Sequence, residues 1–277
     1  VNFGKPIPAD AANTTVARQA LLDLGEEAFQ QRHELKGNLG HACFKSLARQ
    51  PWRPLIVDRF PKRRVLSRGM TLAIAIALSR RWDQTIHSQR VGIVLPPGAG
   101  GVLANLALVL AAKVPVNLNF TAGRAALESC LRRAQIETVI SAEALQKRFA
   151  DFPWPKNTLD VAAEIQACGK VPIILWVVAI FLTPSTLLTR WLGIRRTGDH
   201  EEAGLLFTSG SSGDPKGVVL SHRNLLGNVA QIAATGIMCR TDAMLGCLPL
   251  FHSFGFTVTL WYPLLHGVRL ITIPSPL

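Results

Sequence analysis

The chain has 277 residues, of which 48% are apolar and 17% are charged. This composition supports a large folded core and excludes a disordered or collagen-like chain. The formal charge is +12, and the first 90 residues carry fifteen basic against seven acidic side chains. Such an excess suits an anionic membrane surface or an acidic ligand, with a solvated basic surface as the alternative. We expect no nucleic acid as a partner, because zinc-ligand spacing, interleaved aromatic residues and a helix-turn-helix pattern are missing.

Five cysteines are widely spaced along the chain: Cys43, Cys130, Cys168, Cys239 and Cys247. Their odd number and long intervals predict buried structural thiols in a reducing cytosol, rather than zinc ligands or disulfides. The chain starts at Val1 without an initiator methionine or a signal-peptide pattern. We therefore expect a piece of a longer protein, truncated at both ends.

The first 90 residues predict two kinds of element. Residues 1–12 resemble the end of a strand followed by a loop, and Thr14 or Thr15 is expected to cap an amphipathic helix. A second helix is expected to end near Pro51, before a strand over residues 54–58. Ser67 then begins an apolar helix.

Strands and helices alternate from residue 90 onward. Strands are expected over 91–95, 114–118 and 138–141, with helices between them. This alternation predicts an α/β fold with right-handed βαβ units and a parallel sheet. Residues 96–101 are glycine-rich and predict a tight structural turn, because Leu103 occupies the third glycine position of a dinucleotide loop. Residues 151–170 predict a connector.

The run 171–189 carries no charged side chain. A bilayer span needs about 20 apolar residues, but Pro184 and four hydroxyl residues interrupt this run. The tryptophans Trp176 and Trp191 and the arginines beside Trp191 resemble interfacial anchors. We expect a membrane-contacting segment at 171–192. A true span and a buried helix or strand are the alternatives.

A loop rich in glycine and hydroxyl residues carries the strongest chemical signal, Leu205-Leu-Phe-Thr-Ser-Gly-Ser-Ser-Gly-Asp-Pro-Lys-Gly217. Glycines let the backbone approach a phosphate, successive N–H groups form an anion nest, and a lysine adds positive charge. A Walker-type loop fails here, since it needs Gly-Lys followed by Ser or Thr at a helix start. The run predicts a strand–loop–strand phosphate site formed by Thr208, Ser209, Gly210, Ser211, Ser212, Gly213, Lys216 and Gly217.

Residues 208–217 resemble the phosphate loop of the adenylate-forming (AMP-binding) superfamily. The run Leu248-Pro-Leu-Phe-His-Ser-Phe-Gly255 resembles the next motif of that superfamily, an aromatic–His element. Between them, Ser221 is expected to cap a helix that ends at Gly236. The resemblance implies that residues 38–277 form the amino-terminal portion of an AMP-binding synthetase domain.

A narrower resemblance comes from the runs 115–123 and 248–258 and from Pro274-Ser-Pro276. These are similar to bacterial bifunctional enzymes that join an acyl-[acyl-carrier-protein] synthetase to a 2-acylglycerophosphoethanolamine acyltransferase. Residues 1–35 would then be the carboxy-terminal remnant of a glycerophospholipid acyltransferase domain. The resemblance implies activation of a fatty acid with ATP and Mg²⁺, transfer to acyl carrier protein, and re-acylation of a lysophospholipid at the cytoplasmic face of the inner membrane.

Two other functions stay open. One is a fatty acyl-CoA ligase or another adenylating enzyme that uses coenzyme A. The other is a non-catalytic fragment that binds a nucleotide or a membrane. Pyrophosphate exchange separates the enzymes from the non-catalytic fragment, and the preferred thiol acceptor separates the enzymes from each other.

The resemblance also implies residue roles. Lys216 and the loop around it would hold the β- and γ-phosphates and stabilise charge as pyrophosphate leaves. His252 would lie near the acyl carboxylate or gate its tunnel, with a core histidine as the alternative. His222 is expected to be a surface residue at a helix start, and a phosphate contact is the alternative. The metal ligands and the catalytic lysine of the family are expected beyond Leu277, so no metal ligand is expected within these residues and this piece alone is expected to be inactive.

Overall fold

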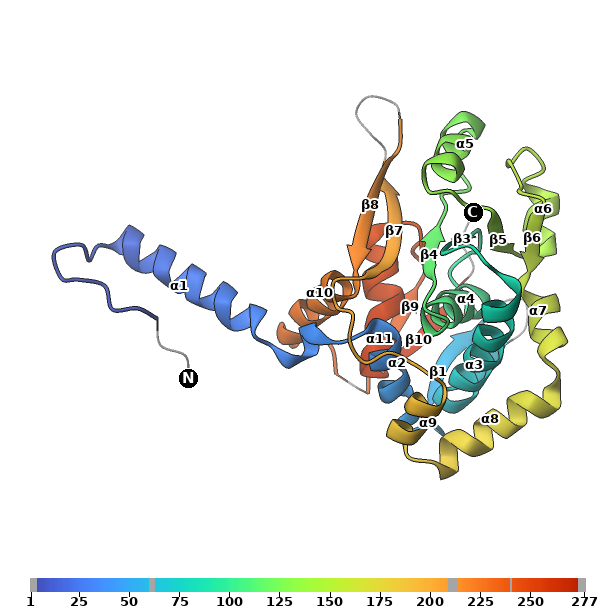
Figure 1. The fold of residues 1–277 in the computed structure, drawn as a ribbon, viewed down its shortest axis with the longest axis horizontal. Coiled ribbons are helices and arrows are strands. Elements are labelled where there is room, and N and C mark those ends of the chain that lie inside the picture. The colour runs from blue at the N-terminus through green and yellow to red at the C-terminus, as the bar shows by residue number, and fades with distance from the viewer. Residues whose placement is uncertain (1–3, 60–62, 209–213, 240, 274–277) are drawn as a thin grey trace.

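The computed structural model describes residues 4–59, 63–208, 214–239 and 241–273 (Figure 1). Its larger sheet has six strands. In spatial order they are β6 (Asn157–Asp160), β5 (Thr138–Ser141), β3 (Arg90–Ile93), β4 (Val114–Asn117), β7 (Glu202–Thr208) and β8 (Lys216–Ser221). The strands from β6 to β7 are parallel neighbours, and β8 pairs antiparallel to β7 at one edge. The expected parallel sheet with βαβ units is confirmed.

A second sheet joins the two halves of the chain. Its spatial order is β2 (Arg64–Ser67), β1 (Pro54–Asp58), β10 (Arg269–Thr272) and β9 (Ala243–Gly246). Strand β1 pairs parallel to β10, with Ile56 opposite Leu270. The early strand predicted over 54–58 is therefore locked against the last described strand of the chain.

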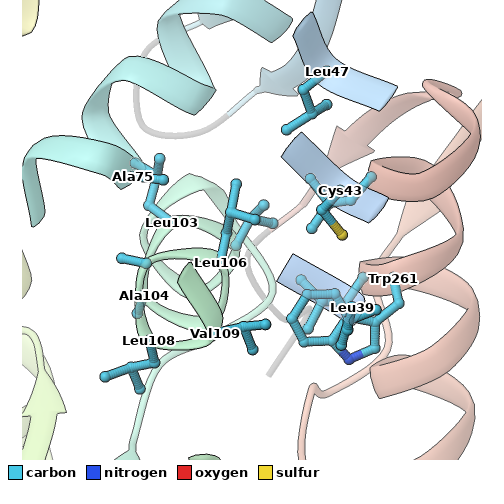
Figure 2. Packing of buried hydrophobic residues seen from close by; sticks show 14 of the residues in the cluster. Leu39, Cys43, Leu47, Ala75, Leu103, Ala104, Leu106, Leu108, Val109 and Trp261 are labelled. Carbon is cyan, nitrogen blue, oxygen red and sulfur yellow. The ribbon is translucent and has the colours of Figure 1, made fainter. Parts of the chain in front are cut away.

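Helices fill the space between the two sheets. Helix α4 (Ala99–Leu110) contacts β1 of one sheet and β3 and β4 of the other, and α3 (Arg68–Thr85) packs beside it. Helix α2 (Leu39–Ala48) turns Leu39, Cys43 and Leu47 toward α4 and toward Trp261 (Figure 2). Trp261 ends the π-helix η2 (Gly255–Trp261) and is fully buried. The main core therefore lies between the sheets.

The other face of the large sheet is covered by α5 (Arg124–Arg133), which buries Leu127 and Cys130 against Val116 and Val139. The remaining helices lie around these layers: η1 (His33–Lys36), α6 (Glu143–Arg148), α7 (Val161–Cys168), α8 (Lys170–Leu182), α9 (Ser185–Trp191), α10 (His222–Ala234) and α11 (Tyr262–His266). Ser221 caps α10 and Gly236 follows it with a φ of +67°, as the sequence predicts.

The amino-terminal region differs from expectation. Residues 4–12 contain no strand. Helix α1 (Thr14–Gln30) is capped by Asn13, whose side chain accepts a hydrogen bond from the Val16 N–H at 2.9 Å. Asn13 therefore takes the capping role expected for Thr14 or Thr15. The helix buries no residue and projects from the body of the molecule (Figure 1).

Residues 151–170 are not a simple connector. They contain β6, which continues the parallel sheet beside β5, and then α7. The Asp160 carboxylate caps α7 by accepting from the Ala163 N–H at 2.7 Å. Glu164 on α7 accepts from Arg81 Nε at 2.8 Å and from Trp82 Nε1 at 2.9 Å, so α7 is fixed to α3. These partners are distant in sequence, which is why local patterning misses the element.

The cysteine prediction is correct in part. All five cysteines are free thiols. Cys43 and Cys130 are buried, and desolvation raises the pKa of Cys130 to about 11 and that of Cys43 further. Cys168 and Cys247 are half-buried, and Cys239 is exposed on the loop before β9. The prediction of buried thiols is therefore wrong for Cys239.

The apolar run 171–189 forms α8 and α9, with Pro184 between them. A buried strand is therefore excluded for this run. Within the described ranges, no single helix is long and apolar enough to cross a bilayer. Helices α7 and α8 meet that test as a pair but bend by 76° at their junction.

Candidate functional site: the phosphate hairpin and the aromatic–His loop

Strands β7 and β8 form the strand–loop–strand unit that the sequence predicts. Thr208 lies opposite Lys216, and Phe207 lies opposite Gly217. The Thr208 hydroxyl donates to the Lys216 carbonyl oxygen at 3.5 Å, between the two strands at the loop end of the hairpin. Ser209, Gly210, Ser211, Ser212 and Gly213 lie outside the described residues, so their part in phosphate binding stays a prediction.

The loop end of the hairpin carries the kinds of group that bind a polyphosphate. Lys216 and Thr208 form one register pair there, and both residues are exposed to solvent. Gly217 leaves no room for a larger residue without movement, since an added Cβ would lie 3.3 Å from both Leu205 Cδ1 and Phe207 Cε1. These described groups fit the phosphates of ATP.

An ion pair ties the loop to the neighbouring helix. Arg133 at the end of α5 lies 2.9 Å from the Asp214 carboxylate, just before β8. Both side chains are largely exposed, so the pair contributes only about 0–1 kcal/mol. The pair places Asp214, near the end of the loop, beside the end of α5. Sequence reasoning missed it, since the two residues are 81 positions apart.

The aromatic–His loop runs from β9 to η2 and places His252 at the surface. Its backbone N–H donates to the Pro249 carbonyl at 3.1 Å, and its Nδ1 accepts from the Phe254 N–H at 3.4 Å. With Nδ1 as the acceptor, Nε2 carries the proton of the neutral ring and can donate to a ligand. The alternative of a buried core histidine is therefore wrong.

Close packing at two glycines seats this loop on the fold. An added Cβ on Gly204 of β7 would lie 2.9 Å from Phe256 Cζ. On Gly101, at the start of α4, it would lie 2.8 Å from Leu250 Cδ1. Leu250 thus packs against the glycine-rich segment 96–101, at Gly101. Within the described part of the chain, no hydrogen bond joins His252 to Lys216; the two motifs are linked through β7.

Aromatic rings support the loop from the other side. Phe251 meets Phe120 edge-on with ring centroids 5.6 Å apart, and Phe120 meets Phe149 at 5.2 Å. Phe120 belongs to the run 115–123, which therefore packs directly against the aromatic–His loop. In the same run, Asn117 forms a buried reciprocal amide pair with Asn105 of α4, at 2.8 and 3.2 Å. Both contacts are long-range and could not be read from spacing.

An apolar cavity of about 590 Å³ opens beside the loop, between α10 and η2. This volume lies in the range of small-molecule sites, and π-helices often occur at functional sites. Ser253 and Phe254, the two residues after His252, are among its lining residues. Its other lining residues are Asn228, Ile232, Thr235, Ile237, Met238, Thr257 and Val258.

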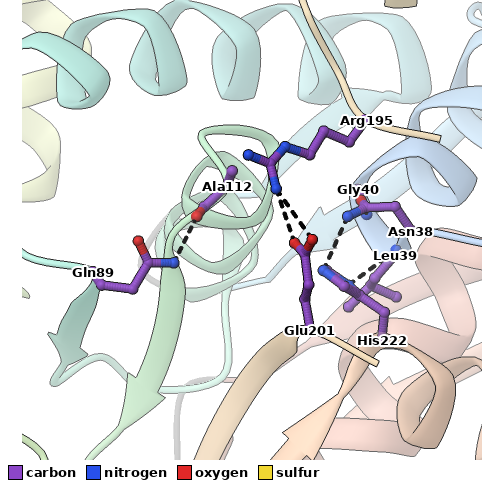
Figure 3. Close-up of polar contacts among 8 residues, drawn as sticks. All are labelled: Asn38, Leu39, Gly40, Gln89, Ala112, Arg195, Glu201 and His222. Carbon is purple, nitrogen blue, oxygen red and sulfur yellow. Dashed lines mark hydrogen bonds and ion pairs between the residues drawn. The ribbon is translucent and has the colours of Figure 1, made fainter. Parts of the chain in front are cut away.

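His222 begins α10 as expected, but it is buried, so both a surface position and a phosphate contact are wrong. Its Nδ1 accepts from the Leu39 N–H at 3.2 Å, and its Nε2 lies 2.9 Å from Asn38 Nδ2 (Figure 3). The Asn38 N–H in turn donates to the Arg196 carbonyl at 3.2 Å. This cluster ties the start of α10 to α2 and to the segment before β7. Burial lowers the pKa of His222 to about 4.

A metal site is not evident in the residues that the structure covers. No group of three or more His, Cys, Asp or Glu side chains there lies close enough together to hold an ion. The hairpin itself offers donors and positive charge rather than carboxylates. Its described groups therefore fit the phosphates of a nucleotide and not its Mg²⁺.

The chain is similar to acyl-activating ligases. Residues 73–277 match the family described as AMP-binding enzyme. The long-chain-fatty-acid–CoA ligase of Bacillus subtilis is 27% identical over 231 residues, which are 74% of this chain and 41% of that ligase. The long-chain-fatty-acid–AMP ligase FadD32 of Mycolicibacterium smegmatis is 26% identical over 197 residues, 68% of this chain and 29% of the ligase. A sulfoacetate–CoA ligase of Cupriavidus necator is 30% identical over 119 residues, 42% of this chain and 23% of the ligase. The matches span less than half of each relative.

Solved structures share the fold. The amino-terminal domain of FACL13 from Mycobacterium tuberculosis superposes with a TM-score of 0.70 at 17% identity, covering 86% of this chain and 57% of that one. The amino-terminal subdomain of NpsA from Klebsiella oxytoca, in complex with 3-hydroxybenzoyl-AMSN, gives 0.68 at 19% identity, with 89% and 56% covered. The fold predicted for the amino-terminal part of an adenylate-forming ligase is confirmed.

The buried His222 predicts a pH-dependent stability. Its folded pKa of about 4 lies below the ordinary 6.5, so the unfolded chain binds more protons between these values. The contribution of the neutral His222 to the free energy of unfolding is fully present above pH 6.5. It is lost as the pH drops toward 4, by at most about 3 kcal/mol. His41, whose pKa is also lowered, adds in the same direction. Thermal melts from about pH 7.5 to about pH 5 should show this loss, and His222→Gln should flatten it.

A matched control is His200→Gln, since the His200 side chain is 83% exposed. This variant should keep the wild-type slope of melting temperature against pH. An equal slope in the His222→Gln variant would show that His222 is not the group that titrates.

Proposed function

Because this chain belongs to the AMP-binding enzyme family, we propose that it supplies the ATP-phosphate site and the acyl pocket of a ligase that activates a fatty acid as an acyl-adenylate. One observation carries the proposal. The hairpin that exposes Lys216 and Thr208 is packed, through Gly204 and Phe256, against the helix that lines an apolar cavity, and His252 directly precedes Ser253 and Phe254 in the lining of that cavity. The proposed phosphate site and the apolar cavity are thus connected through direct packing of β7 against η2.

The cavity supports a fatty acid as the acid substrate. Five of its nine lining residues are apolar (Ile232, Ile237, Met238, Phe254 and Val258), which suits a hydrocarbon tail, and Ser253 offers a polar contact for a carboxylate. Two relatives are named as ligases of long-chain fatty acids. Another is named for sulfoacetate, whose second anionic group would be poorly placed among apolar walls.

The chain's own groups have separable parts in the reaction. The carboxylate attacks the α-phosphorus of ATP and pyrophosphate leaves, so negative charge grows on the departing oxygens. Lys216 stabilises that charge, while Thr208 and the backbone N–H groups of the loop hold the phosphates. His252 donates from Nε2 to the carboxylate or to the α-phosphate. Mg²⁺, when bound, neutralises further phosphate charge, and its ligands are expected outside these residues.

We propose acyl carrier protein as the thiol acceptor and coenzyme A as the alternative. The resemblance of residues 115–123 and 248–258 to bifunctional enzymes supports the carrier protein, whereas relatives named as CoA ligases support coenzyme A. In that proposal residues 1–35 are the end of an acyltransferase domain that re-acylates a lysophospholipid at the cytoplasmic face of the inner membrane. Transfer assays with each thiol, on the native protein that contains this chain, decide between the two acceptors.

Replacement of Lys216 tests the phosphate site. In the native protein, Lys216→Ala should lower the kcat of fatty-acid-dependent ATP–pyrophosphate exchange by roughly 10²–10³, as for a lost oxyanion donor. The KM for ATP should change less, because the lysine acts mainly on charge that develops in the transition state.

Lys156→Ala is the control, since Lys156 is an exposed lysine just before β6. It should leave both constants unchanged. A kcat for Lys216→Ala within about twofold of wild type would remove the phosphate-site assignment.

Filling the cavity tests the acyl site. Val258→Phe, on η2, places a larger ring inside the cavity and should weaken binding of a long-chain fatty acid by about tenfold or more. ATP binding should be unchanged, because the hairpin is not altered. Calorimetric titration of the purified chain with each ligand measures both. Val65→Phe, on the exposed strand β2, is the control; equal fatty-acid affinity in all three proteins would contradict the assignment.

A further inference from the structure

Helix α8 is apolar around its whole circumference, yet it lies on the outside of the molecule. Such helices are normally buried. Of its thirteen residues only Ile180 is buried, where the helix packs on α3. A stripe at helical spacing faces solvent instead: Val171 (68% exposed), Ile174 (56%), Leu175 (63%), Val178 (46%) and Leu182 (79%). This stripe requires a partner that is not water.

Neighbouring residues widen the stripe into an apolar ridge. Trp191 at the end of α9 is 70% exposed and meets Trp176 of α8 with ring centroids 5.3 Å apart. Trp52 is 63% exposed, and its ring centroid lies 6.5 Å from that of Phe181. We use the name apolar ridge for Trp52, Val171, Ile174, Leu175, Val178, Phe181, Leu182, Leu187 and Trp191.

A basic pocket of about 370 Å³ borders the ridge, where α2 meets the start of α9. Lys45 and Arg49 line it, together with Ala42, Ser46, Gln50, Ser185, Leu265, His266 and the buried Arg68, whose guanidinium donates to the Gly267 carbonyl. Exposed Arg53, Lys170 and Arg190 add positive charge around the ridge. The apolar ridge and most of the pocket come from segments 35–57 and 165–198, which contain no aspartate or glutamate. The face is therefore apolar along its crest and cationic at its border.

We propose that the apolar ridge and the basic pocket form a docking surface for a bilayer that contains anionic phospholipids, with a lipid headgroup phosphate in the pocket. An apolar helix face bordered by cations and exposed tryptophans is the arrangement that lies in a membrane interface. Each cation near the surface adds attraction to anionic lipid. The proposal does not depend on the acyl-activating function.

The geometry favours a helix that lies in the interface over one that crosses the bilayer. Thirteen residues of α8 span about 20 Å, against about 30 Å for the hydrocarbon core. The preceding helix α7 cannot extend α8, because Glu164 fixes α7 to Arg81 at 2.8 Å. In Figure 1, α8 and α9 lie at the opposite end of the molecule from the β7–β8 hairpin, so docking leaves the hairpin open to solvent.

Charge also argues against a second copy of the chain as the occupant. A two-fold interface places the same patch on both sides. It would bring two cationic patches, each with Lys45, Arg49 and Arg190, into one interface. An anionic surface is complementary, and a cationic copy is not.

Vesicle flotation of the purified chain tests the proposal. Wild type should float with vesicles of phosphatidylcholine mixed with phosphatidylglycerol and much less with phosphatidylcholine alone. Leu175→Ser combined with Leu182→Ser should abolish flotation. Lys45→Gln and Arg49→Gln should each weaken it about fivefold. Leu21→Ser on α1 and Arg132→Gln on α5 are matched exposed controls and should float as wild type does.

Two further readouts separate membrane docking from misfolding of a variant and from binding of free phosphate. All variants should keep the wild-type circular dichroism, because the changed side chains are exposed or line a surface pocket. Fluorescence of Trp191 should shift to the blue on anionic vesicles, and Trp191→Phe should remove that part of the shift. Glycerol phosphate in solution should not release the protein, since it offers no apolar phase.

Three results would overturn the proposal. One is a wild-type chain that stays unbound with both vesicles. Another is a ridge double variant that floats as wild type does. The third is a wild-type oligomer that the ridge variant converts to a monomer with flotation unchanged, which would make this face an interface between copies.

Discussion

The close approach of the aromatic–His loop to the two glycines Gly204 and Gly101 is the constraint on which the site depends. Phe256 and Leu250 occupy the space where a Cβ would stand, so the loop lies directly on β7 and on the start of α4. A protein interior has few voids to absorb a side chain added there. The hairpin, His252 and the apolar cavity are therefore held as one unit, although they come from separate stretches of sequence.

Much of the fold could be predicted because its signals are local. Buried strands such as β4 read as short apolar runs, and Ser221 indicates the start of α10 through a side-chain cap that needs only its own neighbours. The strand–loop–strand unit around residue 210 is predictable for the same reason, because Lys216 is followed by a strand-forming run and not by a helix. The fold class follows from these pieces, since alternating strands and helices allow few topologies.

The rest depends on contacts between distant residues. The region expected to be a connector contains β6 and α7. Asp160 caps α7, and Glu164 fixes α7 to α3 through Arg81, 83 positions away. His222 is buried because Asn38 and Leu39 cover it, and no feature near residue 222 indicates them. The sequence predicts a membrane-contacting segment around α8 without indicating which side of the helix is exposed. The packing of α8 on α3 decides that side.

The central claim is that the β7–β8 hairpin binds the phosphates of ATP. Hydrogen–deuterium exchange of the purified chain tests it most directly, because it reads the backbone N–H groups that would hold the ligand. If the hairpin holds these phosphates, ATP should slow exchange across residues 205–219 and pyrophosphate should do so in part, whereas adenosine should leave these amides unchanged. Unaltered exchange across 205–219 at saturating ATP, with protection in another part of the chain, would contradict it.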